Sequence, residues 1–399
     1  MCRCVLVVGL FLSQGLLIPV VSFLSLFLRF STGDACLPAA RLTETISTDR
    51  MLPHACHDSQ TDAALQRSTI IRRRDSMPEC SFRLDLIQFL FEHRTGAMTA
   101  LLQLFSFLGE VEGYILVISL IHVAYDKKLA FRLSALVLLA MSLNHVLKTI
   151  IANPRPFIRE GTYMEKWAVS TANAHELAPE YSTPSGHAMA GSCFYSYLYG
   201  SVNSRYVRTA AIATLILTGI SRPYLGVHYI EDIVLGWILG VPIALFAIRF
   251  VGDIRGLWNR HTLQHQLLIV VAASALVWLG TRPLYASSAL GQPLPFVSYL
   301  GFLAGIVLGY PLEAKWVRFD PRSGCIVSKT LRYALSVVLV IGTLLLLDTV
   351  FGLAASDSSI LGNILRYVRY AMAALAGVLL APFLFVRLGL AGTTPKIKE

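Results

Sequence analysis

The sequence predicts an all-α fold, a polytopic bundle of helices that crosses a membrane several times. Of the 399 residues, 55% are hydrophobic and only 15% are charged, and the mean hydropathy is +0.61. Soluble domains carry about 25% charged residues, so this composition excludes an ordinary soluble enzyme. A spanning helix needs about 20 mostly apolar residues. The segments expected to span are 4–29, 111–125, 133–152, 187–202, 208–224, 229–250, 265–281, 296–312, 333–350 and 367–388.

The N-terminal residues 1–29 form the first apolar segment, in which Arg3 and Arg29 are the only charges. They fit either a cleaved signal peptide or a retained signal anchor. The long apolar run and the lack of a small-residue cleavage site favour the anchor. Residues 30–80 are polar and show no sustained periodicity, so we expect a mobile extracytoplasmic segment.

Two further domains are expected after this segment. Residues 81–252 are predicted to form the main membrane domain. Its first part, up to Leu108, has apolar residues interrupted by charged ones and predicts one or two amphipathic helices at the membrane interface. Residues 253–399 are expected to add C-terminal transmembrane helices and a tail.

The net charge of +10 follows the alternation of the expected spans. Basic side chains are expected in every second interhelical loop and in the tail, which marks that face as cytoplasmic. Because the charges do not cluster in one segment, binding to nucleic acid is not expected. The basic residues concerned are Lys127, Lys128, Arg132, Arg205, Arg208, Arg249, Arg255, Arg260, Lys315, Arg318, Arg322, Lys329, Arg332, Lys396 and Lys398.

The first of three polar motifs lies where the helix expected at 133–152 ends on the opposite, extracytoplasmic face. Asn153-Pro154-Arg155-Pro156 must stop this helix, because proline disfavours helix at the preceding residue and has no N–H to continue it. Lys148 lies about one turn before the end, and Arg155 lies just beyond it. Both can reach a common anion, although cations near helix ends also extend to the interface without any such role.

The second motif, Pro184-Ser185-Gly186-His187, opens the next helix on the same face. Ser185 can act as its N-cap, which leaves N–H groups at a helix N-terminus available to an anion. Gly186 lets an oxyanion approach the backbone closely. His187 would then lie beside a bound phosphate, where it can donate a proton to a leaving oxygen.

The third motif begins at Ser221-Arg222, where the chain returns to this face, and ends with His228 and Asp232 at the start of the next helix. The i, i+4 spacing places the imidazole and the carboxylate on one side of that helix. The carboxylate can hold one ring N–H and make the other nitrogen a better nucleophile. Arg222 can bind phosphate oxygens bidentately.

Together the three motifs resemble the signature of the type 2 phosphatidic acid phosphatase superfamily, which also includes glucose-6-phosphatase and the vanadium haloperoxidases. That signature is Lys, six residues, Arg-Pro; then Pro-Ser-Gly-His; then Ser-Arg, five residues, His, three residues, Asp. Residues 148–156, 184–187 and 221–232 meet every element, and the resemblance covers roughly residues 95–250. It implies that the helical bundle contains a phosphatase core of this family.

The resemblance also implies a role for each motif residue. His228 would attack phosphorus and form a phosphohistidine, Asp232 would orient it, and His187 would protonate the departing oxygen. A metal or other cofactor is not needed in this scheme, the sequence offers no clustered carboxylates to hold a metal, and vanadate should inhibit. The residues expected to hold the phosphate oxygens are Lys148, Arg155, Ser185, Gly186 and Arg222.

The expected function is hydrolysis of a lipid phosphate or lipid diphosphate, taken from the bilayer, at the extracytoplasmic face. The form of the third motif with Asp232 and the interfacial segment before the first span favour a lipid. One departure leaves an alternative open, because 167 residues follow the third motif and nine spans counted from residue 111 resemble the layout of glucose-6-phosphatase, which acts on a soluble sugar phosphate. Phosphotransfer to an alcohol and a non-enzymatic transporter that uses the intramembrane Asp348 are further alternatives.

Overall fold

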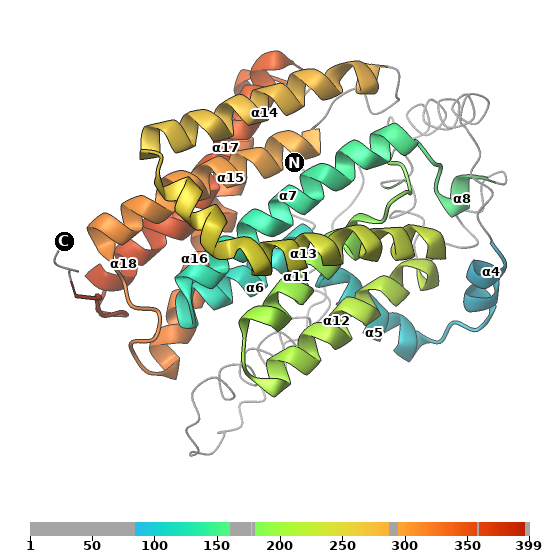
Figure 1. Cartoon of the computed structure of the whole chain (residues 1–399), viewed down its shortest axis with the longest axis horizontal. Helices are drawn as coiled ribbons and strands as arrows, with labels where there is room; N and C mark the ends of the chain where they lie inside the picture. Colours follow the sequence, from blue (N-terminus) through green and yellow to red (C-terminus); the bar gives the residue numbers. More distant parts are fainter. Residues whose placement is uncertain (1–83, 160–176, 178–179, 287–293, 357–358, 396–399) are drawn as a thin grey trace, which may run out of the picture. The chain divides into compact units, whose positions relative to one another are not determined.

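The computed structural model describes residues 84–395 apart from 160–176, 178–179, 287–293 and 357–358 (Figure 1). The anchor or signal peptide expected at 1–29 and the segment expected at 30–80 lie outside the described residues. The described part is all-α, as predicted. Within these residues the only β-type pairing is an isolated antiparallel bridge between Phe319 and Thr393.

Eight helices precede residue 260 among the described residues, and the first two occupy the region predicted to hold interfacial helices. The helix α5 is joined to α6 through a bend of 64°. The bounds are α4 Asp85–Glu92, α5 Gly96–Phe107, α6 Val111–Ala124, α7 Lys127–Ile151, α8 Pro156–Arg159, α11 Gly186–Ser201, α12 Arg205–Tyr224 and α13 Ile230–Asn259.

The C-terminal part is also built from helices, and two of them continue into π-helical turns. The helix α17 runs through η2 into α18, so that residues 360–387 pass as one candidate span. The bounds are α14 Leu263–Ala286, α15 Leu294–Leu312, η1 Glu313–Val317, α16 Ile326–Ala354, α17 Ile360–Leu375, η2 Ala376–Leu380 and α18 Ala381–Arg387.

Six of the described helical segments are long and apolar enough to span a membrane, and the bent pair α5–α6 makes a possible seventh. The protein is therefore a multi-pass membrane protein. The helices α11 and α12, each predicted as a span, do not meet the same criterion, and α11 has only 16 residues. Both carry motif residues at the end where the polar motifs gather.

The prediction that the basic residues lie in loops was wrong for many of them. Lys127, Lys128 and Arg132 lie in the first turns of α7, which Asp126 caps by accepting N–H bonds from Lys128 and Leu129. Other basic residues also lie inside helices and not in loops. Arg205 and Arg208 lie near the start of α12, Lys329 and Arg332 near the start of α16, and Arg249 and Arg255 toward the end of α13. Lys and Arg are good helix formers, and their long side chains extend from a helix end toward water. The helices therefore run well beyond their apolar segments.

The core of the first part is centred on α11, which packs against α7, α12 and α13. Glycines allow α13 to approach α11 closely, because a Cβ on Gly236 or Gly240 would overlap backbone or side-chain atoms of α11. In Figure 1, α7, α11 and α13 lie side by side. This arrangement carries the second motif between the ends of the helices that carry the first and third.

The C-terminal helices pack on the same core. The helix α15 contacts α7 and α17, and α16 contacts α6. Gly301 and Gly305 let α15 touch the backbone of α17. Lys127 at the start of α7 forms a 3.0 Å ion pair with the buried Glu313 of η1. Asp348, the intramembrane acid of the transporter alternative, forms an ion pair with Arg369 of α17.

Candidate active site

The three motifs meet around one cavity of about 220 Å³ at the ends of α7, α11 and α13. Six of the eight predicted site residues line it, namely Lys148, Arg155, Gly186, His187, Arg222 and His228. The other two, Ser185 and Asp232, are completely buried behind this lining. The structure therefore brings together residues that are more than 80 positions apart in the sequence.

The first motif is placed by the end of α7. Ala152 adopts the left-handed conformation, with φ of 53°, and donates its N–H to Lys148 O at 2.9 Å, which is the usual way in which a helix terminates. Pro154 cannot continue the helix, so the chain turns back. The turn directs the Arg155 side chain inward, where it is 1% exposed.

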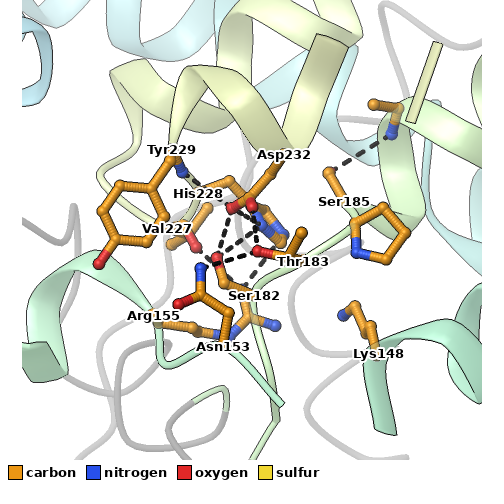
Figure 2. Close-up of polar contacts among 12 residues, drawn as sticks. Lys148, Asn153, Arg155, Ser182, Thr183, Ser185, Val227, His228, Tyr229 and Asp232 are labelled. Atoms are coloured by element: carbon orange, nitrogen blue, oxygen red, sulfur yellow. Dashed lines mark hydrogen bonds and ion pairs between the residues drawn. The ribbon is translucent and has the colours of Figure 1, made fainter. Parts of the chain in front are cut away.

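The closest polar contacts surround Asp232, in the first turn of α13 (Figure 2). Its Oδ2 accepts hydrogen bonds from the Tyr229 backbone N–H at 3.0 Å and from Ser182 Oγ at 2.5 Å. Its Oδ1 accepts from Thr183 Oγ1 at 2.5 Å. Oδ2 also lies 3.2 Å from Nδ1 of His228. The buried carboxylate is therefore compensated by donors on both oxygens, as a buried charge must be.

These contacts orient the His228 imidazole. Nδ1 faces Asp232 Oδ2 and Ser182 Oγ, each at 3.2 Å, and Nε2 faces Nη1 of Arg155, also at 3.2 Å. A carboxylate beside Nδ1 favours the tautomer with the proton on Nδ1. The lone pair of Nε2 then points toward the cavity side that Arg155 occupies, so the ring presents a nucleophilic nitrogen next to a cation.

Arg155 is held by four contacts from its whole guanidinium group. Nε donates to the backbone oxygen of Glu180 at 3.2 Å and Nη1 to that of Val227 at 3.0 Å, while Nη2 donates to Glu180 Oε2 at 3.0 Å. The fourth contact is the one to His228 described above. Such a planar fork suits the oxygens of a carboxylate or a phosphate.

Lys148 and Arg155 converge on one carboxylate oxygen. Lys148 Nζ lies 3.4 Å and Arg155 Nη2 lies 3.0 Å from Oε2 of Glu180. The first motif was expected to bind a common anion, and here the Glu180 carboxylate is that anion. Its side chain is 40% exposed, so it lies at the mouth of the cavity and not behind it.

The charges around the cavity set the protonation states of the groups outside the helical spans. Burial lowers the pKa of the His228 imidazole well below its usual range, and the nearby Arg155 and Arg222 lower it further. Burial raises the pKa of Glu180, but Lys148 and Arg155 outweigh this effect and bring it to about 2. At neutral pH His228 is therefore uncharged and Glu180 is ionised.

The second motif caps α11 as predicted. Ser185 Oγ accepts from the backbone N–H of Ala188 at 3.4 Å, and the Ser185 N–H donates to Asp232 O at 3.1 Å. Asn144 on α7 donates to the Pro184 carbonyl at 3.0 Å. Gly186 lines the cavity. A Cβ added there would lie 3.1 Å from Asn144 Oδ1, so a larger residue would be crowded against α7.

A second polar cluster lies across the cavity. Arg222 Nη1 donates to Ser106 Oγ at 2.6 Å, and Ser106 Oγ donates to Glu110 Oε1 at 3.4 Å. The same Glu110 oxygen lies 3.5 Å from Nε2 of His187. Gly109, at the bend between α5 and α6, permits this approach, because a Cβ there would lie 3.1 Å from Cδ2 of His187.

Sequence reasoning missed Glu110, Glu180, Ser182 and Thr183. Ser182 and Thr183 directly precede the second motif, and this adjacency is the one signal that pointed to them. The two glutamates lie in irregular segments with no periodicity. Among the described residues no three His, Cys, Asp or Glu side chains are grouped so that they could hold one metal ion; metal independence stays a prediction.

Two family profiles match the chain. The PAP2 superfamily profile matches residues 129–255. The profile of the transmembrane extension of PAP2 superfamily phosphatases matches residues 297–393. Together they cover more than half of the chain, including all three motifs and α15 to α18.

Curated relatives match at modest identity. A dihydrosphingosine 1-phosphate phosphatase of Schizosaccharomyces pombe is 29% identical over 140 residues, which are 33% of each chain. An undecaprenyl-diphosphatase of Sulfolobus acidocaldarius is 25% identical over 42% of this chain and 78% of its own length. The lipid phosphate phosphatase delta of Arabidopsis thaliana is 28% identical over 38% of each chain.

This chain thus spans well under two thirds of the length of the yeast and plant relatives. No solved structure matches the chain. The first profile nevertheless contains all three motifs, and the second covers most of α15 and all of α16 to α18. The protein belongs to the PAP2 superfamily and carries the transmembrane extension of that family.

Proposed function

We propose that this protein hydrolyses a lipid phosphate or lipid diphosphate at the extracytoplasmic face through a phosphohistidine on His228. The observation that carries the proposal is the neutral, buried imidazole held between Asp232 and the cations of the cavity. An uncharged nitrogen can attack phosphorus, and the cations beside it can stabilise the charge on the phosphoryl oxygens in the transition state.

In the first step Nε2 of His228 attacks phosphorus, the N–P bond forms, and the bond from phosphorus to the lipid oxygen breaks. Asp232 Oδ2 stabilises the positive charge that grows on the imidazole. The phosphoryl oxygens take the positions that Glu180 Oε2 now occupies between Lys148 and Arg155, with Arg222 and the N-terminus of α11 on the other side.

His187 completes the reaction. It donates a proton to the departing lipid oxygen, and in the second step it accepts a proton from the water that attacks the phosphohistidine. Inorganic phosphate leaves and His228 returns to its neutral form. Glu110 Oε1, 3.5 Å from His187 Nε2, favours the protonated imidazole that the first step needs.

The lipid substrate and the face are supported by separate observations. Relatives named for a sphingoid base phosphate, a polyprenyl diphosphate and a lipid phosphate match this chain at 25–29% identity. Lys127 begins α7 at the end opposite to the one that lines this cavity, and the bias of such cations toward the cytoplasm supports an extracytoplasmic cavity.

Activity tests the proposal directly. Purified protein in detergent is expected to release inorganic phosphate from lipid phosphates with a divalent-metal chelator present, and vanadate should inhibit it. A labelled phosphoenzyme that survives alkali and decays in acid is expected, and His228→Ala should abolish both the intermediate and turnover. His261→Ala, in the exposed turn after α13, is the matched control and should behave as wild type. Turnover in His228→Ala near the wild-type rate would overturn the mechanism.

A substrate screen and a labelling experiment test the finer points. Equal turnover of soluble sugar phosphates and lipid phosphates would favour the glucose-6-phosphatase-like alternative. A cysteine introduced by His175→Cys should react with an impermeant thiol reagent from outside intact cells. The native Cys325, exposed at the start of α16, should react only after the membrane is opened, and the reverse pattern would overturn the assignment of the face.

A further inference from the structure

A second cavity lies directly below the catalytic one. It has a volume of about 110 Å³ and is lined by residues of α6, α7, α15, α16 and the α17–η2 segment. Val111 and Met141 line both cavities, so the two share a wall. An apolar cavity of this order stays dry and accepts hydrocarbon. Representative lining residues are Ile118, Val137, Leu138, Phe302, Ile306 and Val340.

One face of α7 lines both cavities. Lys148, His145 and Asn144 face the catalytic cavity, and the residues that continue this face at spacings of three and four line the lower one. Those residues are Met141, Leu138, Val137, Ser134, Ala130 and Lys127. The helix therefore presents a polar wall above and an apolar wall below.

Two further helices repeat this division. On α15, Pro295 and Tyr299 line the catalytic cavity, and Phe302, Ile306 and Tyr310 line the lower one. On α6, Glu110, Val111 and Glu112 at the start of the helix line the upper cavity, and Tyr114, Ile118 and His122 line the lower one. The α6 and α7 segments thus present charged or polar side chains to the upper cavity and mainly apolar ones to the lower cavity, as a site for an amphiphile requires.

Lys127 lines the far end of the lower cavity. Lys127 Nζ bonds both carboxylate oxygens of Glu313 at 3.0 Å and Phe319 O at 2.7 Å. From Met141 to Lys127 the helix spans about 21 Å at 1.5 Å per residue. An extended alkyl chain advances about 1.3 Å per carbon for C–C bonds near 1.5 Å, so this length corresponds to about sixteen carbons.

We propose that the cavity between the catalytic core and the C-terminal helices binds the single alkyl chain of the substrate, whose phosphate lies in the catalytic cavity. The proposal rests on the proposed function and names its substrate class: a phosphate ester of a lipid with one long chain. The transmembrane extension then forms one wall of the substrate site. Because bilayer lipid is as apolar as the cavity, the site selects chains by length and number and not by hydrophobicity.

Obstruction at two depths provides the test. Ser134 and Ala130 lie seven and eleven residues below Met141, at depths of about 10 and 16 Å. Ser134→Phe is expected to limit chains to about eight carbons and Ala130→Phe to about twelve, since the chain advances about 1.3 Å per carbon. The measurement is kcat/KM for monoalkyl phosphates of 4 to 18 carbons, with a dialkyl lipid phosphate for comparison. Leu139→Phe, at a half-exposed position of the same helix, is the control.

We expect a loss of at least tenfold for the hexadecyl ester in both cavity variants, with turnover of the butyl ester unchanged. The same substrate should show normal turnover in Leu139→Phe. Wild-type chain-length profiles in both folded cavity variants, or dialkyl esters turned over as well as monoalkyl ones, would overturn the proposal while leaving the phosphatase function intact.

Binding without turnover separates the two proposals further. A hexadecyl phosphate with a diazirine at its terminal carbon should label lower-cavity residues such as His122 or Tyr310 in the His228→Ala protein. Labelling that is confined to membrane-facing residues such as Leu139 would overturn the proposal. Labelling in the lower cavity together with a wild-type protein that releases no phosphate would refute the phosphatase function and keep the chain site.

Discussion

Replacing Asp232 by asparagine isolates the charge of this residue from its shape. The carboxylate accepts three bonds on Oδ2, from Ser182, Tyr229 and His228, and one on Oδ1, from Thr183. An asparagine whose oxygen takes the Oδ2 position keeps the three donors. Its amide nitrogen then faces Thr183, whose hydroxyl oxygen already accepts from Asn153 Nδ2 at 2.8 Å.

The stability cost follows from this geometry. One hydroxyl hydrogen loses its acceptor, which costs about 1 kcal/mol, and the bonds that remain lose the assistance of the charge. We expect the free energy of unfolding of Asp232→Asn to fall by about 1–3 kcal/mol. Asp232→Ala, in contrast, leaves four donors without an acceptor, at about 1–3 kcal/mol each, and is not expected to fold.

The catalytic cost is larger. Attack by Nε2 of His228 develops positive charge on the ring, and a neutral amide at 3.2 Å stabilises that charge far less than a carboxylate does. The same change in the buried aspartate of a serine protease lowers kcat by about 10⁴. We expect kcat of Asp232→Asn to fall by about 10³ to 10⁴, which is about 4–5.5 kcal/mol of transition-state stabilisation.

The assay is phosphate release at saturating substrate, together with the melting temperature of the detergent-solubilised protein. Asp348→Asn, which removes a carboxylate paired with Arg369, serves as the control for the loss of one negative charge. We expect it to retain kcat. An Asp232→Asn protein that melts near the wild-type temperature and keeps kcat within tenfold would refute the assigned role of the carboxylate.

Three further predictions concern the cavity mouth and the packing of the helices. Glu180→Gln removes the carboxylate that competes for Lys148, so the inhibition constant of phosphate should fall about fivefold. The pKa of Glu180 in the folded protein is about 2, which is below its value in the unfolded chain. The ionised carboxylate therefore stabilises the fold above about pH 4.5, and this stabilisation is lost as the pH falls toward 2. A melting-temperature difference between wild type and Glu180→Gln that already vanished at pH 6 would contradict this. Gly240→Ala should lower the melting temperature because its Cβ would overlap α11, at a cost of about 1–3 kcal/mol, whereas Gly252→Ala, with open space around it, should not. Lys127→Met leaves the buried Glu313 without its ion-pair partner and should lower the free energy of unfolding by about 3–5 kcal/mol. Adding Glu313→Leu should recover most of this loss. A double variant that is no more stable than Lys127→Met would argue against the ion pair.

Much of the local geometry of the candidate site was predictable, because each of its three motifs is a short segment of sequence. Ser185 was expected to cap α11 and does so. His228 and Asp232 were expected to face each other across one turn, and their nearest atoms are 3.2 Å apart. Such contacts depend on the period of the helix and on the chemistry of helix ends, which a short segment contains in full.

The partners that come from other segments were not predictable in this way. Glu180 binds Lys148 and Arg155 from a segment without periodicity, and Glu110 reaches His187 only because α5 and α6 meet at a 64° bend. The helix ends were also misjudged, since the cations of α7 and α12 were assigned to loops. An apolar pattern records which residues meet lipid or core, but it does not mark how far a helix extends into water.

By itself, the sequence determined that this is a multi-pass helical membrane protein of the PAP2 superfamily, with three motifs at the ends of helices. Composition and motif spacing are properties of the chain alone, and they are sufficient for those conclusions. Only the tertiary structure decided that Glu180 lies between Lys148 and Arg155, that Ser182 and Thr183 donate to Asp232, and that the C-terminal helices line an apolar cavity next to the candidate site. Each of these depends on side chains from distant segments meeting in space, and close packing of the helices is what brings them together.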